Sequence, residues 1–204
     1  METGESVSGE DAMKKYQIIY ADPPYKYRQG KSMGTNFAGA ADAQYECMPL
    51  EDILALPVHT IADDKCILFL WVTFPMLKEG LRVVETWGFE YKTVAFTWLK
   101  MNQNNMGVFF GVGYYTKSNA EICLLATKGN AHSLVKDNSI SQIIMTPKMA
   151  HSRKPSECRE RIVQLMGDIP RIELFARQKV EGWDSIGFDI DGCDIREALE
   201  KMVK

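Results

Sequence analysis

The sequence Gln-Ile-Ile-Tyr-Ala-Asp-Pro-Pro-Tyr at residues 17–25 joins an apolar run to an acid, two prolines and an aromatic ring. The run from Tyr16 to Ala21 is almost continuously apolar, which predicts a strand buried on both faces of a parallel sheet. Consecutive prolines fix φ, remove two backbone donors and push the preceding residue into an extended conformation. We therefore predict a buried strand whose end presents the carboxylate of Asp22 on a rigid loop.

This strand end carries the groups needed to hold a planar base that bears an amino group. The Asp22 carboxylate and a proline carbonyl can accept hydrogen bonds from the amino group, while the Tyr25 ring stacks on the base. The structural alternative is a strand followed by a Pro-Pro turn that holds an acid and an aromatic by accident.

The composition fits one globular domain. A chain of 204 residues with 46% hydrophobic residues can bury a sizeable core. Its formal net charge of -3 gives no general basic field, so any contact with nucleic acid must be local. We expect residues 1–15 to form a flexible leader, because most of them are small, polar or acidic, and residues 16–204 to form a single domain.

The cysteines and histidines argue against a disulfide framework and against a metal site. The 5 cysteines are scattered without a C-x-x-C pair, which favours a reducing compartment. The 3 histidines are dispersed, and no acid or thiol clusters with them at the spacing of metal ligands. No apolar run reaches the roughly 20 residues of a membrane span. We therefore expect a soluble cytoplasmic protein without a metal site.

Hydrophobic periodicity predicts strands that alternate with helices. A strand, a helix and a strand follow one another between residues 65 and 99, and such a βαβ unit is typical of a parallel sheet with right-handed crossovers. Pro75 opens the helix of this unit and Gly88 closes it. The predicted strands are residues 16–21, 65–72, 91–99, 120–127, 142–145 and 171–177, and the predicted helices are residues 49–56, 75–88, 155–167 and 194–203. Asp194 is the predicted N-cap of the last helix.

Two long loops interrupt this pattern. The first follows Tyr25 and contains Lys26, Tyr27 and Arg28, which suit phosphate contact and stacking beside the base. Loops of this length are usually lids or binding loops, and a solvated loop without a ligand is the alternative. The second loop, residues 101–117, is rich in asparagine and glycine but holds none of the phosphate-binding glycine motifs.

A cationic segment precedes the third predicted helix. Residues 151–157 read His-Ser-Arg-Lys-Pro-Ser-Glu, so Arg153 and Lys154 stand where the amides of a helix N-terminus can join them. This predicts a site for a phosphate or a cofactor carboxylate, with a solvated helix cap as the alternative. Beyond the strand at residues 171–177, Asp184 and Asp189 are available to hold a cofactor ribose.

Five motifs occur along the chain in a set order: Asp-Pro-Pro-Tyr, Phe-Leu-Trp-Val, His-Ser-Arg-Lys-Pro-Ser-Glu, Ile-Glu-Leu-Phe-Ala-Arg and Gly-Trp-Asp. In this order they resemble the methyltransferase-like family of adenine N6-methyltransferases. That family includes the catalytic subunit of the messenger-RNA adenosine methyltransferase and many phage and bacterial DNA enzymes. The match spans residues 17–192, and several independent motifs at sensible spacing make coincidence implausible.

The resemblance implies an α/β, Rossmann-like methyltransferase fold in permuted order, with the catalytic motif before the cofactor-binding strand. It implies S-adenosylmethionine as the cofactor. Asp22 and Pro23 then accept from the adenine amino group, Tyr25 stacks, Tyr45 gates the substrate loop, and Lys154 pairs with the cofactor carboxylate. The implied catalytic residues are Asp22, Pro23, Pro24 and Tyr25; the cofactor-binding residues are Asp22, Lys154, Leu174, Phe175, Arg177, Phe188 and Asp189; and the substrate-binding residues are Tyr25, Lys26, Tyr27, Arg28, Tyr45 and Arg153.

The chain departs from the family pattern at two points. Some members hold the ribose with an asparagine followed by a glutamine or glutamate, where this chain has Phe188 and Asp189. An acid upstream of the catalytic strand, which some relatives use for the cofactor base, has no clear counterpart here, and Asp11 is the residue considered for it. These departures bear on how the cofactor nucleoside is held.

The chemistry of the target supports the role of Asp22. The exocyclic nitrogen of adenine is a poor nucleophile because its lone pair is delocalised into the ring. Acceptors for both of its protons favour a more tetrahedral nitrogen, whose lone pair can attack a sulfonium methyl group, so an aspartate of ordinary pKa suffices. A target in duplex DNA must first be extruded.

Three functions stay open on this reading. The first is an adenine N6-methyltransferase acting on DNA in the cytoplasm of a bacterium or a phage-infected host, and the second is an RNA enzyme or the active half of a heterodimer. The third is a non-catalytic nucleic-acid-binding scaffold, which the intact Asp-Pro-Pro-Tyr motif and Lys154 disfavour. The sequence alone leaves open the recognition sequence, the strandedness of the target, and the oligomeric state, in which a homodimer and a heterodimer are both candidates.

Overall fold

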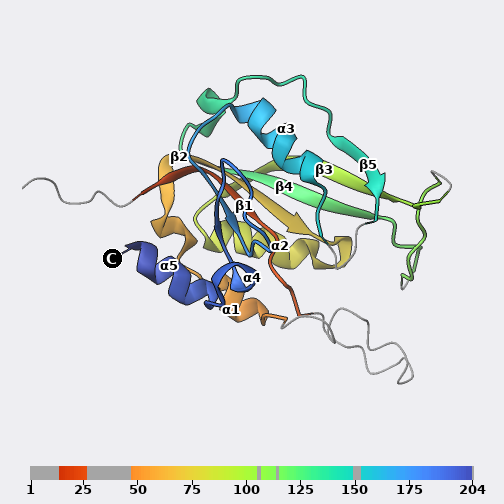
Figure 1. The fold of residues 1–204 in the computed structure, drawn as a ribbon, viewed down its shortest axis with the longest axis horizontal. Coiled ribbons are helices and arrows are strands. Elements are labelled where there is room, and N and C mark those ends of the chain that lie inside the picture. The colour runs from red at the N-terminus through yellow and green to blue at the C-terminus, as the bar shows by residue number, and fades with distance from the viewer. Residues whose placement is uncertain (1–13, 27–46, 105–106, 114, 149–152, 204) are drawn as a thin grey trace, which may run out of the picture.

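A computed structural model describes residues 14–26, 47–104, 107–113, 115–148 and 153–203. Its centre is one seven-stranded sheet with the strand order β5-β3-β4-β2-β1-β6-β7 (Figure 1). The strands are β1 (Tyr16–Ala21), β2 (Ala62–Val72), β3 (Glu90–Met101), β4 (Ala120–Lys128), β5 (Ile143–Pro147), β6 (Arg171–Leu174) and β7 (Asp184–Ile186). The six strands predicted from the sequence are therefore present, but the last ends at Leu174 instead of residue 177, because the chain turns at Phe175, and β7 is an addition.

The sheet is mixed, which corrects the prediction of a parallel sheet. β1 runs parallel to β2 and β6, and β6 runs parallel to β7, but β4 lies antiparallel between β2 and β3. β4 follows β3 through the loop at residues 102–119 without a crossover helix, so the chain simply folds back. The direction of an interior strand is hidden in its sequence, because a strand buried on both faces is apolar whichever way it runs.

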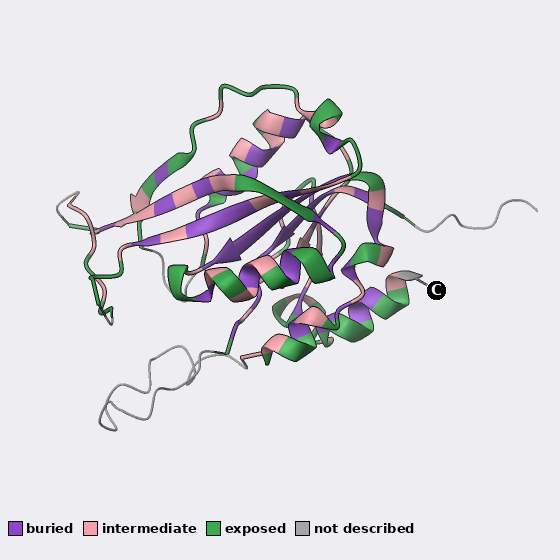
Figure 2. Ribbon diagram, turned by 180° about the vertical axis from the view of Figure 1, so that it is seen from behind, coloured by how far each residue is buried: buried purple, intermediate pink, exposed green. Residues whose placement is uncertain are grey.

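Helices cover both faces of the sheet. The α-helices are α1 (Leu50–Leu54), α2 (Leu77–Thr86), α3 (Ser156–Met166), α4 (Phe188–Asp191) and α5 (Ile195–Val203), and the 3-10 helices are η1 (Val58–Thr60), η2 (Phe74–Met76) and η3 (Ala131–Leu134). α3 lies on one face, while α1, α2 and α5 lie on the other (Figures 1 and 2). None of the described helices is both long enough and apolar enough to cross a membrane.

The alternation of side chains along β1 explains why it is buried on both faces. Ile19 and Ala21 belong to the apolar cluster under α1, α2 and α5, whereas Ile18 and Tyr20 belong to the cluster under α3. All four side chains are at most 1% exposed. The near-continuous apolar run therefore makes β1 an interior strand, as predicted.

The helix ends follow the signals in the sequence. Gly88 and Gly167 have positive φ values of 84° and 83° just beyond α2 and α3, where a residue without Cβ adopts this conformation freely. The carboxylate of Asp194 accepts the backbone N–H of Arg196 at 2.8 Å, so Asp194 caps α5 as predicted. The short helix α4, between β7 and α5, was not predicted.

The topology brings the Asp-Pro-Pro-Tyr segment and the end of β6 to one edge of the sheet. β1 lies between β2 and β6 in the sheet. The next strand along the chain after β1 is β2, on one side of it, whereas β6 on the other side is followed by β7, which lies farther out in the opposite direction. In open α/β sheets, the crevice at such a change of direction, beyond the carboxyl ends of the strands, is the usual ligand site. Asp22 follows β1 and Phe175 follows β6 at this point, since Ala21 pairs with Leu174.

Candidate active site

The loop after β1 is fixed by backbone hydrogen bonds. The carbonyl of Pro23 accepts the N–H of Tyr25 at 2.9 Å, and the carbonyl of Pro24 accepts the N–H of Met48 at 2.8 Å. Lys26 donates its backbone N–H to the carbonyl of Met48 at 3.2 Å, so the two segments bridge. Each proline carbonyl retains a second lone pair. These hydrogen bonds therefore anchor the loop. Both proline carbonyls already accept a backbone N–H, which could not be seen from the sequence.

Asp22 lies at one end of a chain of four alternating charges. Lys154 Nζ donates to Oδ2 of Asp22 at 2.7 Å and lies 3.2 Å from Oε2 of Glu121. Lys100 donates to Oε1 of the same glutamate. The four side chains are between 10% and 23% exposed. The chain Asp22–Lys154–Glu121–Lys100 is formally neutral, which is how buried charges are tolerated.

Burial and neighbouring charges set the protonation of this ion chain. Burial raises the pKa of Asp22 above its usual value, and the opposing effect of Lys154 is smaller. For Lys154, burial lowers the pKa, but the carboxylates of Asp22 and Glu121 together raise it above the ordinary lysine value. The pKa of Glu121 is lowered in spite of burial, because Lys154 and Lys100 both face it. Lys154 is therefore firmly charged, and Asp22 is the more basic of the two carboxylates that face it.

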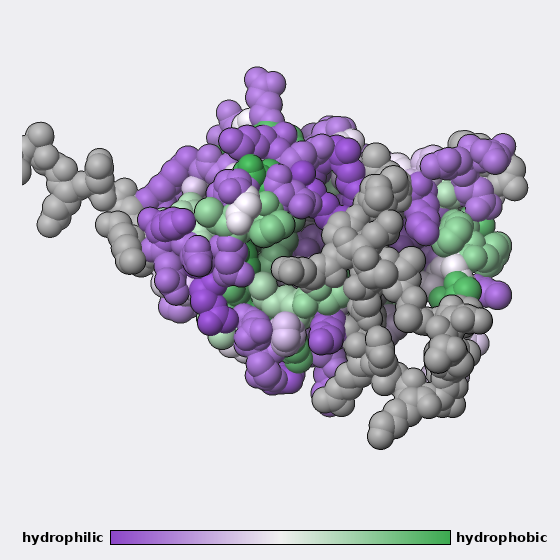
Figure 3. Space-filling view, turned by 60° about the horizontal axis from the view of Figure 1, so that its bottom comes forward, coloured by the Kyte–Doolittle hydropathy of each residue, from purple (hydrophilic) through white to green (hydrophobic). Residues whose placement is uncertain are grey.

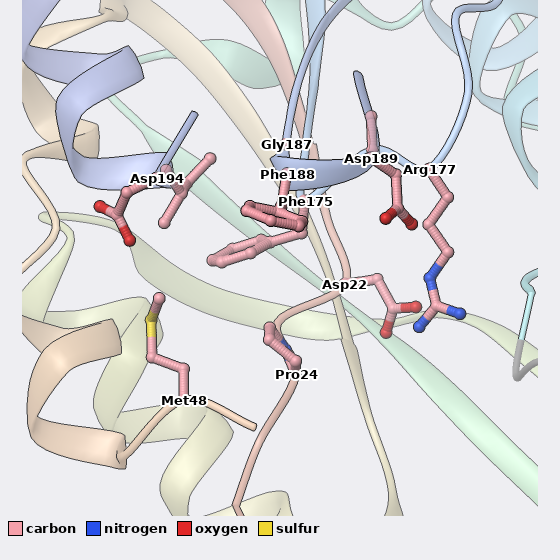
Figure 4. A pocket seen from close by; sticks show the side chains of 11 residues that line it. Asp22, Pro24, Met48, Phe175, Arg177, Gly187, Phe188, Asp189 and Asp194 are labelled. Atoms are coloured by element: carbon pink, nitrogen blue, oxygen red, sulfur yellow. The ribbon is translucent and has the colours of Figure 1, made fainter. Parts of the chain in front are cut away.

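A cavity of about 440 Å³ opens beside Asp22. Its volume lies in the range of small-molecule sites, which is roughly 300–1,000 Å³. In Figure 4 the rings of Phe175 and Phe188 lie together on one side of it, across from Pro24 and Met48. In Figure 3 hydrophobic side chains gather in the middle of the face turned forward, with hydrophilic ones around them.

Carboxylates stand around this apolar cavity. Asp22, Asp189 and Asp194 all line it, and the side chains of Asp22 and Arg177 point toward one another (Figure 4). A cavity with apolar rings and several carboxylates suits a ligand that is flat, cationic or rich in hydroxyl donors.

A second, smaller cavity of about 30 Å³ adjoins the first and shares Asp22, Phe175 and Arg177 with it. Its remaining lining is more cationic, from Arg153, Lys154 and Arg159 together with Tyr20, Glu173 and Gln178. The two cavities therefore form one site with an apolar, acidic part and a small cationic part.

The turn after β6 holds the shared wall in place. Phe175 has a φ of 60°, the only positive φ at a non-glycine position among the described residues. Such a conformation costs about 1–3 kcal/mol and persists where the surroundings enforce it. The turn packs against Gly187, where an added Cβ would lie 2.5 Å from the carbonyl oxygen of Ala176. Ala176 also donates to the carbonyl of Ile186 at 3.0 Å, so the strained turn is held from the β7 side.

A buried ion pair supports the floor of the small cavity. Arg159 on α3 is 6% exposed, and its Nη1 lies 3.2 Å from Oε1 of Glu173 on β6. Burial is the main cause that raises the pKa of Glu173, and Arg159 opposes it. Since removal of one partner of such a pair leaves an uncompensated charge, Arg159 and Glu173 depend on each other.

Most of the residues implied for the cofactor come together in the structure. Asp22, Phe175, Arg177, Phe188 and Asp189 line the large cavity, and Lys154 lines the small one. The side chain of Leu174 is fully buried in the core, so only its backbone lies near the site. Asp184, offered beside Asp189 as a ribose ligand, instead accepts from Tyr16 at 2.6 Å and forms an ion pair with Lys14.

The residues implied for the substrate are placed less completely. Arg153 lines the small cavity and donates to Oε1 of Gln178. Lys26 is exposed, while Tyr25 is only 8% exposed and packs in the core. Tyr27, Arg28 and Tyr45 lie outside the described residues. Stacking by Tyr25 stays a prediction, and access to its ring is limited in this conformation.

Sequence reasoning missed several residues of the site. Glu121 and Lys100 each carried a usable signal, because each is an isolated charge in or beside an apolar strand. Arg159 and Glu173 also occupy an apolar helix face and an apolar strand, respectively. Asp194 was found only as a helix cap, although it also lines the cavity.

The chain is similar in sequence to known proteins over most of its length. Residues 16–189 match the MT-A70 family model. The Type II methyltransferase M.MunI of Mycoplasma sp is 35% identical over 190 residues, which are 87% of this chain and 78% of that protein.

Two further relatives are more distant and much longer. The N(6)-adenosine-methyltransferase MT-A70-like protein of Arabidopsis thaliana is 28% identical over 198 residues, or 95% of this chain and 27% of that protein. The N(6)-adenosine-methyltransferase non-catalytic subunit METTL14 of Xenopus tropicalis is 25% identical over 197 residues, or 90% of this chain and 41% of that protein. The family match contains Asp22, Lys154 and the cavity wall up to Asp189, and the chain therefore belongs to the MT-A70 family.

Proposed function

We propose that the protein transfers a methyl group from S-adenosylmethionine to the exocyclic N6 amino group of adenine in DNA. The observation that carries the proposal is the carboxylate of Asp22, held by Lys154 where the two cavities join. The relationship to a Type II methyltransferase over most of both chains supports DNA as the substrate.

The composition of the site supports S-adenosylmethionine as the methyl donor. When bound, this group supplies an electrophilic methyl carbon on a sulfonium centre. The rings of Phe175 and Phe188 offer faces for the adenine, and the carboxylate of Asp189 offers an acceptor for ribose hydroxyls. Lys154 and Arg177 offer cations for the carboxylate end, and Asp22 an acceptor for its ammonium. The backbone of Leu174 completes the wall after β6.

The residues of the chain act on the amino group of the target base. The Asp22 carboxylate accepts one N–H of the adenine amino group, and the second lone pair of the Pro23 carbonyl accepts the other. These acceptors draw the nitrogen toward tetrahedral geometry, so its lone pair can form the new bond to carbon as the bond from carbon to sulfur breaks. The nitrogen becomes acidic as that bond forms, and its proton leaves through the Asp22 carboxylate to water.

The strand order supports a permuted Rossmann-like methyltransferase arrangement. In this assignment β1 is the catalytic strand and β6 is the cofactor-binding strand, although β1 comes first in the chain. The two strands are neighbours in the sheet and end at the same edge. Residues 16–204 act as a single catalytic domain in this arrangement.

A labelling experiment tests the proposed function. Tritiated S-adenosylmethionine is offered with single-stranded DNA, duplex DNA and RNA of mixed sequence, and the products are digested to nucleosides. We expect N6-methyldeoxyadenosine to carry the label. The proposal would be overturned by label in another nucleoside. It would also be overturned if the protein binds S-adenosylmethionine but no nucleoside carries label.

RNA is the second candidate substrate, and a specific observation supports it. The relative from Arabidopsis thaliana is named an N(6)-adenosine-methyltransferase and matches 95% of this chain. Label in N6-methyladenosine from the RNA sample would select this alternative. The similarity to METTL14, a non-catalytic subunit, is the reason to consider a heterodimer. Activity that appears only after a partner chain is added would identify this chain as the active half.

A further inference from the structure

The loop between β3 and β4 projects from the edge of the sheet that carries Asp22. β4 is antiparallel to both β2 and β3, so β3 runs in the same direction as β2 and β1. The carboxyl end of β3 and the start of β4 therefore lie at the edge where β1 ends. Lys100 and Glu121, which close the ion chain to Asp22, are the charged residues at the base of this loop. We call residues 102–119 the arm (green, at the right of Figure 1).

The described part of the arm has a defined backbone of two successive turns. Asn102 donates to the carbonyl of Gly107 at 2.8 Å, which closes the first turn. Gly111 and Ser118 exchange two backbone hydrogen bonds at 2.8 and 3.2 Å, which close the second. At Gly113 an added Cβ would lie 1.8 Å from the carbonyl oxygen of Thr116, so this turn requires glycine.

The second turn presents large apolar side chains to solvent. Phe110 and Val112 are each 67% exposed, and Tyr115 is 93% exposed. In Figure 3 hydrophobic side chains form a separate group at the end of the molecule where the arm lies. An exposed apolar group of this kind, on a fixed backbone, usually marks a binding surface.

The charge of the arm selects the class of partner. Residues 101–120 contain no acid and one lysine, Lys117, whereas 27 of the 204 residues of the chain are acidic. The same stretch contains 4 asparagines and 1 glutamine, whose amides can both donate to and accept from base edges. Lys148, beyond β5, lies 4.9 Å from the centre of the Phe109 ring, which adds a second cation at the arm. Aromatic rings, amides and lysines without carboxylates are complementary to nucleic acid.

We propose that the arm is a DNA-contacting element that binds the duplex beside the target adenine, with Phe110 and Tyr115 against base or sugar faces and Lys117 on a phosphate. The proposal rests on the proposed function for its choice of DNA. The arm would give this small chain a surface for DNA recognition outside the cavities. Extrusion of the target base leaves neighbouring bases unstacked, and exposed rings at the same edge can cover them.

Binding measurements test the arm. Anisotropy of a fluorescent mixed-sequence DNA duplex is followed with the wild-type chain and with the Phe110→Ala/Tyr115→Ala variant. Since a stacked base contributes about 1–3 kcal/mol, we expect Kd to rise about 10-fold or more. Lys117→Gln should reduce the slope of log Kd against log salt by about 1.

A matched control separates the arm from general surface effects. Tyr91→Ala removes another exposed ring, which is 40% exposed at the opposite end of β3. We expect its Kd to stay within about 2-fold of wild type, a change below roughly 0.5 kcal/mol. Thermal unfolding of each variant excludes loss of fold, and Tyr115→Ala alone serves if the double variant is unstable, because this side chain is almost fully exposed.

Three results would overturn the arm proposal. The first is an unchanged duplex affinity of the Phe110→Ala/Tyr115→Ala variant, and the second is that the wild-type chain does not bind duplex at all. The third is a wild-type dimer that becomes a monomer in this variant while its DNA affinity is retained. The last would assign the arm to a second copy of the chain. The proposed function fails separately, when the wild-type chain binds duplex but labels no DNA adenine.

Discussion

The two halves of the sheet contribute differently to the edge that carries the cavities. β2, β1, β6 and β7 run parallel, and the ends of β1 and β6 lead into turns that line the cavities. The other half, β5, β3 and β4, contains the antiparallel strand and ends in the exposed arm. Lys154 joins the halves, because its ammonium lies between Asp22 and Glu121. The turns of the parallel half thus line the cavities, and the antiparallel half supplies charges behind Asp22.

Asp22→Asn tests whether the parallel half holds the reacting group. The amide has nearly the same shape but cannot accept a proton and is a weaker acceptor. We expect kcat to fall by about 10²–10³-fold or more, as for loss of an acceptor or donor aimed at the transition state. Single-turnover methyl transfer to labelled DNA measures the change.

Stability serves as the control for Asp22→Asn. A folded-state pKa above the unfolded value means that the folded chain binds the proton more tightly, so the ionised carboxylate weakens the fold at neutral pH. Lys154 also keeps its ion pair with Glu121 in this variant, so the melting temperature is expected to stay within a few degrees of wild type. Wild-type methyl transfer in a normally folded variant would remove Asp22 from the mechanism.

Lys154→Met breaks the link between the halves. Loss of a charge-assisted contact should weaken S-adenosylmethionine binding by about 1.5–3 kcal/mol, measured by calorimetry. Because Lys154 lowers the pKa of Asp22, its removal raises that pKa further, and the acidic limb of the kcat profile moves to higher pH. An unchanged cofactor affinity with an unchanged pH profile would contradict both assignments. Lys92→Met, which removes a lysine at the opposite end of β3 from the ion chain, is the matched control.

Glu121→Gln removes the negative charge that the antiparallel half places beside Lys154, while Lys154 itself is kept. Glu121 raises the pKa of Asp22, so the variant should shift the acidic limb to lower pH, opposite to Lys154→Met. We expect kcat to fall by about 10-fold, since a hydrogen bond to a charged group contributes roughly 1.5–3 kcal/mol and part of it is retained by the amide. A limb that moves in the same direction as in Lys154→Met would show that the ion chain does not act as a unit.

The same division explains what could be predicted from the sequence. Strands such as β1 and β2 are buried on both faces and carry nearly continuous apolar runs, so their existence follows from pattern alone. The cluster of Asp22, Lys154, Phe175 and Arg177 was implied by motifs that each lie beside or within a predicted element. Both kinds of signal are local in the chain.

What escaped prediction depends on contacts between distant segments. The antiparallel direction of β4 leaves no trace in its composition, and Glu121 meets Lys154 only because β4 lies two strands from β1. The strained turn at Phe175 is enforced by Gly187, which is 12 residues away in the sequence. Burial of the Tyr25 ring likewise follows from packing around Met48, which no short motif specifies.

Two glycine-to-alanine substitutions compare the two halves through the free energy of unfolding, and their expected effects are the smallest. At Gly80 in α2, an added Cβ would lie 2.4 Å from Cγ1 of Val72, a 3% exposed residue at the end of β2. Overpacking of a close-packed core costs typically 1–3 kcal/mol, so Gly80→Ala should lower the free energy of unfolding by about that amount in a denaturant titration.

Gly113→Ala is expected to behave differently, although its clash with the Thr116 carbonyl is geometrically worse. The arm lies outside the core, and an exposed turn can rearrange locally without unfolding the sheet. The global free energy of unfolding should therefore change by less than about 0.5 kcal/mol, while duplex affinity falls because the rings of Phe110 and Tyr115 are no longer held in one arrangement. Equal destabilisation by the two substitutions would mean that the arm belongs to the cooperative core, and that its exposed rings have a structural role on that side of the sheet.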